Sequence, residues 1–422
     1  MTAITRALNP VVVRQHLGVT LLYGNIQKTQ TMPDVCRSVN GHHSGIGSGS
    51  LGIFTKTQVK LTAQGLQRFH DFVLQDQSAK LLPKERVSNC LKKRIDKHKN
   101  RSVRYNEVRE KAHWANVQRC GGVWICPVCA KQITEKRREE LKQGIERWKT
   151  VHSGSVLLLT LTFSHSITHP LKMSLEGLRK ATKIFLENSK VKAIQKLMGA
   201  EHKVNSLEVT YGQNGWHPHR HILLLVKGSF DYSKYLDELK TLWIKSCVRA
   251  GLSAPSMQHG LDIRDGEYAS NYVSKWGLES ELTKGHVKKG RGSYTPFDLL
   301  NYSCVDADDV FRSGRSAANL YQEYGVAIKG QRQLSWSRGL KALLLVEEKT
   351  DEELAQETEK DSIELLEVED YIFGLLTHYQ LRHEYLICLE NDFKNGCFGN
   401  GSADLLLEKM LIYEIENLEK VA

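Results

Sequence analysis

Three histidines stand at alternate positions in the segment Trp216–Val226, as His217, His219 and His221. Side chains two residues apart on a β-strand point to the same face, so a regular strand would gather all three imidazoles on one side. Two neutral imidazoles at positions i and i+2 can chelate one divalent metal ion. The apolar run Ile222–Val226 predicts that the strand continues into a buried, rigid part of a sheet. The pattern favours metal binding by His219 and His221, with His217 in reserve.

A carboxylate on the preceding predicted strand, Ser206–Thr210, would complete this site. Two hairpin turns are open. A turn centred on Gln213–Asn214 pairs Glu208 with His219, and a turn centred one residue later pairs Glu208 with His221. Both registers put the carboxylate on the histidine face, whereas a three-residue loop would put it on the other. Two histidines and a carboxylate suit Mn²⁺, and Mg²⁺ is tolerated when it keeps some of its waters.

Two tyrosines, Tyr268 and Tyr272, stand four residues apart in the segment Gly266–Gly277, which reads as a helix. On a helix such residues share one face, and Lys275 lies on a nearby face. A phenol has a pKa of about 10 and is a poor nucleophile at neutral pH. A nearby metal ion or lysine would lower the cost of forming the phenolate and would neutralise a phosphate target. The pattern therefore indicates a tyrosine nucleophile beside the metal site.

Three cysteines crowd together as Cys120, Cys126 and Cys129. In an intracellular protein such crowding favours a metal site over disulfides. A structural zinc ion takes four ligands in a tetrahedron, and a Cys-x-x-Cys turn supplies two of them. Cys90 is the nearest upstream candidate for the fourth ligand, and His113 is its rival. Four thiolates leave no open coordination position, so the predicted zinc ion would be structural.

The formal net charge of +11 is spread unevenly along the 422 residues. Residues 347–422 carry 20 acidic and 6 basic side chains, a net charge of −14, which leaves +25 on residues 1–346. A region this basic predicts a polyanionic partner, and nucleic acid is the first choice. The basic segments 86–150 and 284–292 are the candidates for phosphate contact, which would make affinity fall steeply with salt. Charge alone does not separate DNA from RNA or from an anionic membrane.

The order of the predicted elements indicates an α+β protein with helices on an antiparallel sheet. Val156–Phe163 reads as a buried strand, and a helix within 174–198, the hairpin, a helix over 230–250 and a short strand from Asp262 follow it. We expect five regions: 1–85, of unknown role; 86–150, the basic cysteine-rich segment with an exposed charged helix over 130–149; 151–285, with the histidine and tyrosine motifs; 286–346, basic and rich in Gly and Ser; and 347–422, acidic and mostly helical.

These motifs together resemble the plasmid rolling-circle replication initiators of the HUH endonuclease superfamily. Leu158–Thr162 (LLTLT) looks like the family's first motif, Trp216–His221 (WHPHRH) like its metal-binding motif, and Tyr268–Lys275 (YASNYVSK) like the YxxxYxxK motif of the two-tyrosine members. The segment Cys120–Ala130 is similar to a cysteine-rich segment that many such initiators carry upstream. Arg220 departs from the family, which prefers a hydrophobic residue there. Between two ligands it would point to the opposite face of the strand.

The resemblance implies an HUH nuclease domain whose antiparallel sheet carries a nicking site on one face. The metal site would polarise the scissile phosphate, and Tyr272 would attack it, which gives a 5′-phosphotyrosine and a free 3′-OH that a host polymerase extends. Tyr268 would make the second attack, which closes the displaced circle, although the order of the two tyrosines is open. Lys275 would neutralise phosphate or assist the phenol.

Two other functions are open at this point. A single-strand transposase could use the same motifs, and a non-enzymatic zinc-containing DNA-binding regulator would leave the histidines and tyrosines unused. A covalent protein–DNA adduct separates the nucleases from the regulator. The expected partners are single- and double-stranded DNA at a replication origin. The acidic region could recruit a host helicase or mediate self-association, or it could be a solvated helical appendage.

A membrane partner is not expected. The apolar runs fall far short of the roughly 20 residues that a membrane-spanning helix needs. The first residues, MTAITRALNP, are interrupted by Arg6 and Pro10 and do not form a secretory signal. The sequence therefore predicts a cytoplasmic protein.

Overall fold

The computed structural model describes residues 63–228, 230–265, 268, 272, 293–304, 311, 313–356 and 362–421. These residues fall into two compact units. The first contains residues 63–76, 88–120 and 356–421, and the second contains residues 77–87 and 121–355. Lys275, the basic run 284–292 and most of the predicted helix Gly266–Gly277 lie outside the described residues, although Tyr268 and Tyr272 are described.

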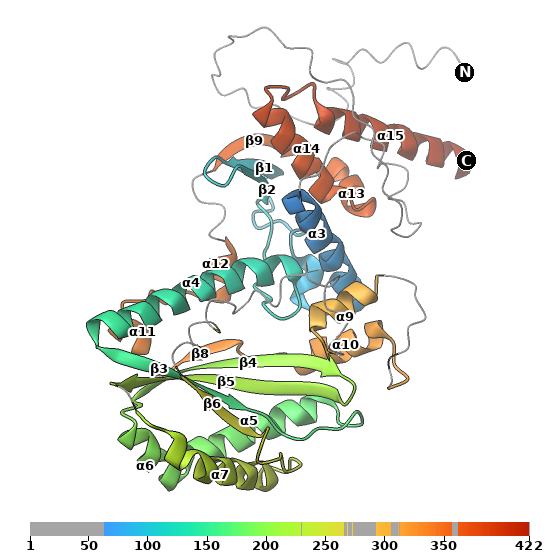
Figure 1. Cartoon of the computed structure of the whole chain (residues 1–422). Helices are drawn as coiled ribbons and strands as arrows, with labels where there is room; N and C mark the ends of the chain where they lie inside the picture. The colour runs from blue at the N-terminus through green and yellow to red at the C-terminus, as the bar shows by residue number, and fades with distance from the viewer. Residues whose placement is uncertain are drawn as a thin grey trace. The chain divides into compact units, whose positions relative to one another are not determined.

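The second unit is built on an antiparallel sheet (Figure 1). The strands run in the order β6-β3-β5-β4-β7, and β8 pairs with β4 beside β7. Their bounds are β3 Gly154–Leu161, β4 His202–Gly212, β5 Gly215–Lys227, β6 Leu261–Arg264, β7 Ser293–Tyr294 and β8 Leu334–Trp336. The two apolar segments predicted as strands form the neighbouring strands β3 and β5. Their consecutive apolar residues are all buried because helices cover both faces of the sheet.

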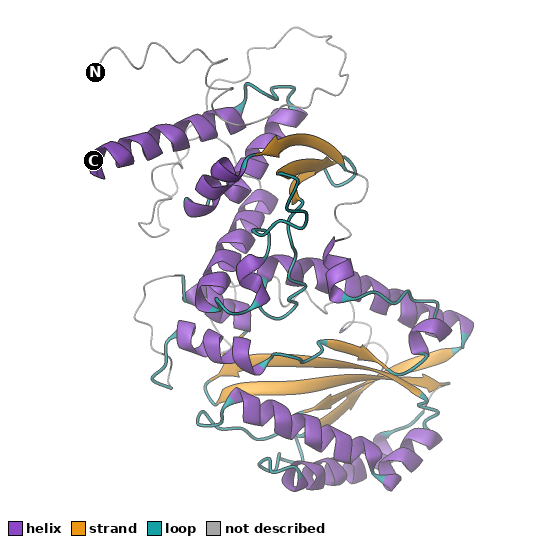
Figure 2. Cartoon of the chain, turned by 180° about the vertical axis from the view of Figure 1, so that it is seen from behind, coloured by secondary structure: helices purple, strands orange, loops and turns teal. Residues whose placement is uncertain are grey.

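One face of this sheet is covered by three helices, α5 (Leu171–Glu187), α6 (Ser189–Leu197) and α7 (Leu236–Arg249). Figures 1 and 2 show this layer from opposite sides. The 3-10 turn η2 (Ser233–Tyr235) leads into α7. Two further helices, α9 (Pro296–Tyr302) and α10 (Ala317–Ala327), pack against each other, with α9 also against β4 and α10 against α5. The short turn η1 (Arg86–Asn89) begins in this unit.

The other face of the sheet packs against α4 (Pro127–Val151) and α11 (Leu340–Leu343). The core there joins Leu141, Ile145 and Trp148 of α4 to apolar residues of β3 and β5. The prediction of an exposed charged helix over 130–149 was therefore wrong for one face of α4. These apolar residues recur at helical spacing and form a narrow apolar face. Because most of the residues between them are charged, the sequence of the helix as a whole looks polar.

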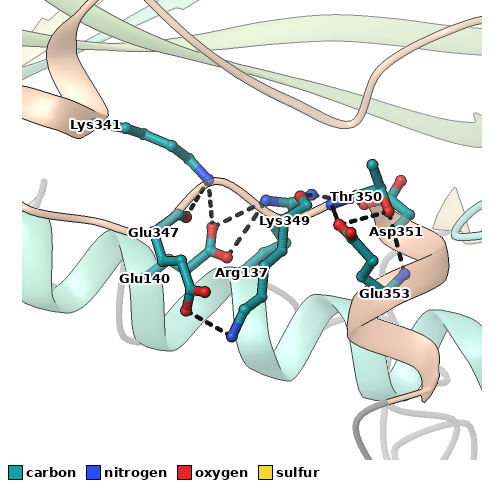
Figure 3. Close-up of polar contacts among 8 residues, drawn as sticks. All are labelled: Arg137, Glu140, Lys341, Glu347, Lys349, Thr350, Asp351 and Glu353. Carbon is teal, nitrogen blue, oxygen red and sulfur yellow. Dashed lines mark hydrogen bonds and ion pairs between the residues drawn. The ribbon is translucent and has the colours of Figure 1, made fainter.

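Residues 346–353 follow α11 and include the start of α12 (Asp351–Gln356). They contact α4 through a partly buried cluster of ion pairs and hydrogen bonds (Figure 3). Arg137 contacts Glu140 at 3.0 Å, Asp351 at 3.0 Å and the carbonyl oxygen of Lys349 at 2.7 Å. Lys341 donates to the same Glu140 carboxylate at 3.0 Å. Glu140 thus lies between two cations, and only 14% of its side chain is exposed.

Glu140→Gln should destabilise the protein by about 3 kcal/mol, because it leaves the buried Lys341 without its carboxylate partner and takes one carboxylate away from Arg137, which keeps Asp351. Glu139→Gln is the matched control. Glu139 is half-exposed and pairs with Lys136 at 3.4 Å, so its loss should cost less than about 1 kcal/mol. Urea unfolding followed by circular dichroism measures both. Equal effects of the two substitutions would contradict the assigned role of the cluster.

The first unit is built on a second antiparallel sheet, of order β2-β1-β9. Its strands are β1 Arg101–Asn106, β2 Lys111–Ala115 and β9 Ile363–Val368. Its helices are α3 Ala63–Leu81, which continues into the second unit, α13 Asp370–His378, α14 Arg382–Lys394 and α15 Ser402–Val421. Trp114 of β2 lies in the core, with its ring edge-on to Phe373 and stacked on Tyr385.

Residues 356–421 of the acidic region belong to this unit and are not a solvated appendage. Its strand β9 pairs with β1 of the basic segment, and Arg101 of β1 forms an ion pair with Asp370 at 2.5 Å. Arg68 pairs with Glu390 in the same way. The apolar residues of α13 and α14, hidden among acidic neighbours, supply the buried side of both helices. Part of the opposite charge seen in the two regions of the sequence is therefore paired within the fold.

The expected α+β class, with antiparallel sheets and many helices, is confirmed. Within the described part of the chain, no helix is both long enough and apolar enough to cross a lipid bilayer.

Candidate active site

The β4–β5 hairpin sets the register of the predicted metal site. Gly212 pairs with Gly215, so the turn is the two-residue Gln213–Asn214, and Glu208 lies directly opposite His219. This is the first of the two registers that the sequence left open. Gly215 has a φ of +88°, a left-handed conformation that favours glycine, and a side chain there would meet the backbone of Ile167.

Glu208, His219 and His221 form one group, with a ligand atom from each within 4.8 Å of the others. The Nε2 atoms of His219 and His221 lie 3.2 and 3.4 Å from the same carboxylate oxygen, Oε2 of Glu208. Burial raises the pKa of Glu208, but the contacts with both histidines outweigh it and hold the pKa well below its usual range. The carboxylate is therefore charged at neutral pH and suits a divalent cation.

His217, the reserve ligand of the sequence analysis, contacts His165, which lies outside the metal group. The ring of His217 stacks on His165 with centroids 4.7 Å apart, and His217 is not part of the group of possible ligands among the described residues. Burial, followed by the neighbouring His219 and His165, lowers the pKa of His217 to about 3. His165 was not among the predicted site residues, although it stands close to the end of the predicted strand Val156–Phe163. Only its position two residues after that strand could have pointed to it.

Tyr272 reaches this group, and Tyr268 contacts other residues. The Tyr272 hydroxyl donates to Oε1 of Glu208 at 2.9 Å, and its ring lies 4.7 Å from that of His221. The carboxylate therefore touches the histidines with one oxygen and the phenol with the other. The Tyr268 side chain is 56% exposed, and its ring lies beneath the guanidinium group of Arg264 at 5.2 Å.

Arg220 is directed away from the histidines, as expected. It is the partner of Leu161 on β3 and of Leu207 on β4, and it is largely buried on the sheet face that α5 covers. Burial, together with the nearby Arg179 of α5, lowers its pKa. The helix layer thus covers the one charged residue inside the histidine motif and keeps it apart from the site.

The four predicted zinc ligands lie together. A sulfur atom from each of Cys90, Cys120, Cys126 and Cys129 lies within 4.8 Å of the others, and all four residues are buried. The backbone N–H of Cys120 donates to the sulfur of Cys90 at 3.4 Å. Zinc–sulfur bonds are about 2.3 Å long, so such a set fits one tetrahedral ion. The rival ligand His113 is not in the group and pairs with Arg104 across β1 and β2.

Comparisons with known proteins identify the family of this chain. A family model described as a replication protein matches residues 111–383. The "Protein rep" of Streptomyces lividans is 27% identical over 315 residues, which cover 59% of this chain and 67% of that protein. The "Neomycin resistance protein" of Streptomyces cyanogenus is 26% identical over 136 residues, 26% of this chain and 31% of that protein. No solved structure matches. Because the family model covers well over half of the sequence, this chain belongs to the replication protein family.

Proposed function

We propose that this chain initiates rolling-circle replication of a plasmid by nicking one DNA strand at the origin through Tyr272. The observation that carries the proposal is the shared carboxylate. Glu208 accepts the Tyr272 hydroxyl at 2.9 Å with one oxygen and faces two histidine nitrogens with the other. A nucleophile is thus held beside a set of metal ligands on a sheet, as an HUH nuclease requires.

The residues fit a divalent ion, Mn²⁺ or Mg²⁺. His219 and His221 would supply two nitrogen ligands and Glu208 one oxygen ligand, and three protein ligands leave positions open for phosphate and water. When bound, such an ion polarises the phosphate and neutralises its developing charge. The carboxylate carries the negative charge that this cation needs, because its pKa is depressed.

The chemical step follows from the contacts of Tyr272. The phenol oxygen attacks phosphorus in line and gives its proton to solvent, and its hydrogen bond to Oε1 of Glu208 orients it before the attack. The bond from phosphorus to the 3′ oxygen breaks, and that oxygen leaves as a hydroxyl after taking a proton from solvent. The products are a 5′-phosphotyrosyl link and a 3′-OH primer. The ester keeps the energy of the broken bond, so later joining needs no nucleotide cofactor.

Tyr268 and Lys275 complete the proposal. Tyr268 lies one helical turn before Tyr272 in the sequence and is exposed, so it would be free to take the second strand when the displaced circle is closed. Lys275 would neutralise phosphate close to the nucleophile. Two tyrosines allow one covalent strand to be held while the other is transferred.

The test incubates the full chain with Mn²⁺ and end-labelled single-stranded oligonucleotides of randomised sequence, followed by a denaturing gel. The expected product is an SDS-resistant protein adduct on the 5′ end of the downstream fragment. Cleavage without an adduct would point to a metal hydrolase and overturn the tyrosine mechanism. Salt-sensitive binding without cleavage, on these oligonucleotides and on supercoiled plasmid, would favour a DNA-binding regulator. A transposase would join the adduct to a second, unrelated strand rather than recircularise it.

The cysteine group would hold one structural zinc ion per chain. We expect metal analysis of the purified protein to find about one zinc per chain, and Cys126→Ser to lose it. Cys388→Ser is the matched control. Cys388 is also buried, but burial raises its pKa to about 12, so it stays a neutral thiol. Equal zinc contents of the two variants would contradict the site.

A further inference from the structure

The two histidines of the metal group are oriented by different kinds of partner. The Nδ1 atom of His219 lies 3.2 Å from the backbone carbonyl oxygen of His217. The Nδ1 atom of His221 lies 3.0 Å from the side-chain hydroxyl of Thr160. A carbonyl oxygen can only accept a hydrogen bond, so it fixes the proton of His219 on Nδ1. The partner of His221 is a hydroxyl, which can donate or accept and which mutation can remove.

We propose that Thr160 is a positioning residue for the metal site, whose hydroxyl contacts Nδ1 of His221 and holds the ring in the orientation in which Nε2 binds the ion. The inference rests on the proposed metal site. A metal ligand must offer a lone pair, and a neutral imidazole has one nitrogen with a lone pair and one with a proton. A hydroxyl can donate or accept, so it complements either tautomer. When Nε2 binds the ion, the ring proton lies on Nδ1, where the Thr160 oxygen accepts it and holds the plane of the ring.

The sheet places this contact by register. Thr160 on β3 is the direct partner of His221 on β5, so their side chains lie on the same face. On its other side Thr160 pairs with Asp262 of the short strand β6. Strands on both sides therefore fix the threonine backbone, and the 3.0 Å contact does not depend on a loop. The Nε2 atom of the same ring faces Oε2 of Glu208 at 3.4 Å.

The contact also explains a threonine in an otherwise apolar strand. Val156, Leu157, Leu158 and Leu159 are all buried, and a valine at position 160 would have the same shape as threonine and a higher preference for the buried part of a strand. The hydroxyl is what threonine adds. Its partner is an imidazole nitrogen of the metal group, and this contact gives the Leu- and Thr-rich strand a direct role in the site.

The test measures Mn²⁺ binding to the full chain by isothermal titration calorimetry. Thr160→Val removes the hydroxyl and keeps the shape, and we expect the Kd for Mn²⁺ to rise about 10- to 100-fold. Thr160→Ser restores the hydroxyl and should bind Mn²⁺ within a few-fold of the unmodified chain. Thr162→Val is the matched control, because the Thr162 hydroxyl donates to the carbonyl oxygen of His259 and not to a member of the group. It should leave the Kd unchanged.

Two results would overturn the inference. One is a Thr160→Val variant that binds Mn²⁺ as tightly as Thr162→Val. The other is a Thr160→Ser variant as weak as the valine, which would assign the effect to the methyl group. His219→Ala separates this failure from a failure of the metal site itself. If it abolishes binding while Thr160→Val does not, only the positioning role is wrong. If it binds Mn²⁺ normally, both the site and the inference are wrong.

Discussion

Tyr272→Phe should reduce formation of the covalent protein–DNA adduct by at least about a thousandfold, because it removes the attacking oxygen and nothing else. The ring of Tyr272 packs beside His221, and phenylalanine keeps this packing while it removes the hydroxyl that donates to Glu208. Gel quantification of the adduct under single-turnover conditions measures the effect. Thermal unfolding of the variant should match that of the unmodified chain.

Tyr268→Phe is the informative comparison for this substitution. Tyr268 is exposed and contacts Arg264 rather than the metal group. We therefore expect the first adduct to form at a near-normal rate and the later joining of the displaced strand to fail. An adduct that persists in Tyr272→Phe and disappears in Tyr268→Phe would reverse the two roles. Equal nicking and joining by the double variant would exclude a tyrosine mechanism altogether.

His219→Ala should lower metal-dependent cleavage by at least about a hundredfold without unfolding the protein. The imidazole lies opposite Glu208 and contributes one of three ligands. Removing metal with EDTA should abolish cleavage by the unmodified chain, and added Mn²⁺ should restore it. His217→Ala should have a smaller effect, below about tenfold, because its ring stacks on His165. Full activity of His219→Ala in EDTA would argue against metal catalysis.

The grouping of Glu208 with His219 and His221 could be predicted from the sequence because these residues are close together in the chain. Glu208 and His219 belong to one hairpin, and two rules, alternation along a strand and turn length, place them on one face. The sequence could not decide between a turn centred on Gln213–Asn214 and one centred on Asn214–Gly215, since both pairs contain residues suited to turns. The choice of Cys90 over His113 rested only on chemistry and chain order, and the structure groups Cys90 with the other three thiols.

The remaining features depend on contacts between distant residues, for which the sequence carries no local signal. His165 meets His217 only because the end of β3 lies beside the start of β5. The buried face of α4 was obscured because Ile145 and Trp148 stand among basic and acidic residues. The pairing of β9 with β1 joins two regions that differ in charge and looked separate for that reason.

That last pairing has a consequence for how the chain is made. Val368 is the partner of Arg101, 267 residues earlier, and β1 is the middle strand of its sheet. At a synthesis rate of about 5–20 residues per second, β9 is synthesised roughly 13–53 s after β1. Residues 121–355 are synthesised in this interval and can begin to fold before β9 exists. Until β9 pairs with it, one edge of β1 can form hydrogen bonds with any other extended chain. A chain released before residue 363 is synthesised would contain the residues proposed for nicking, but one edge of β1 would stay unpaired. We expect such products to aggregate.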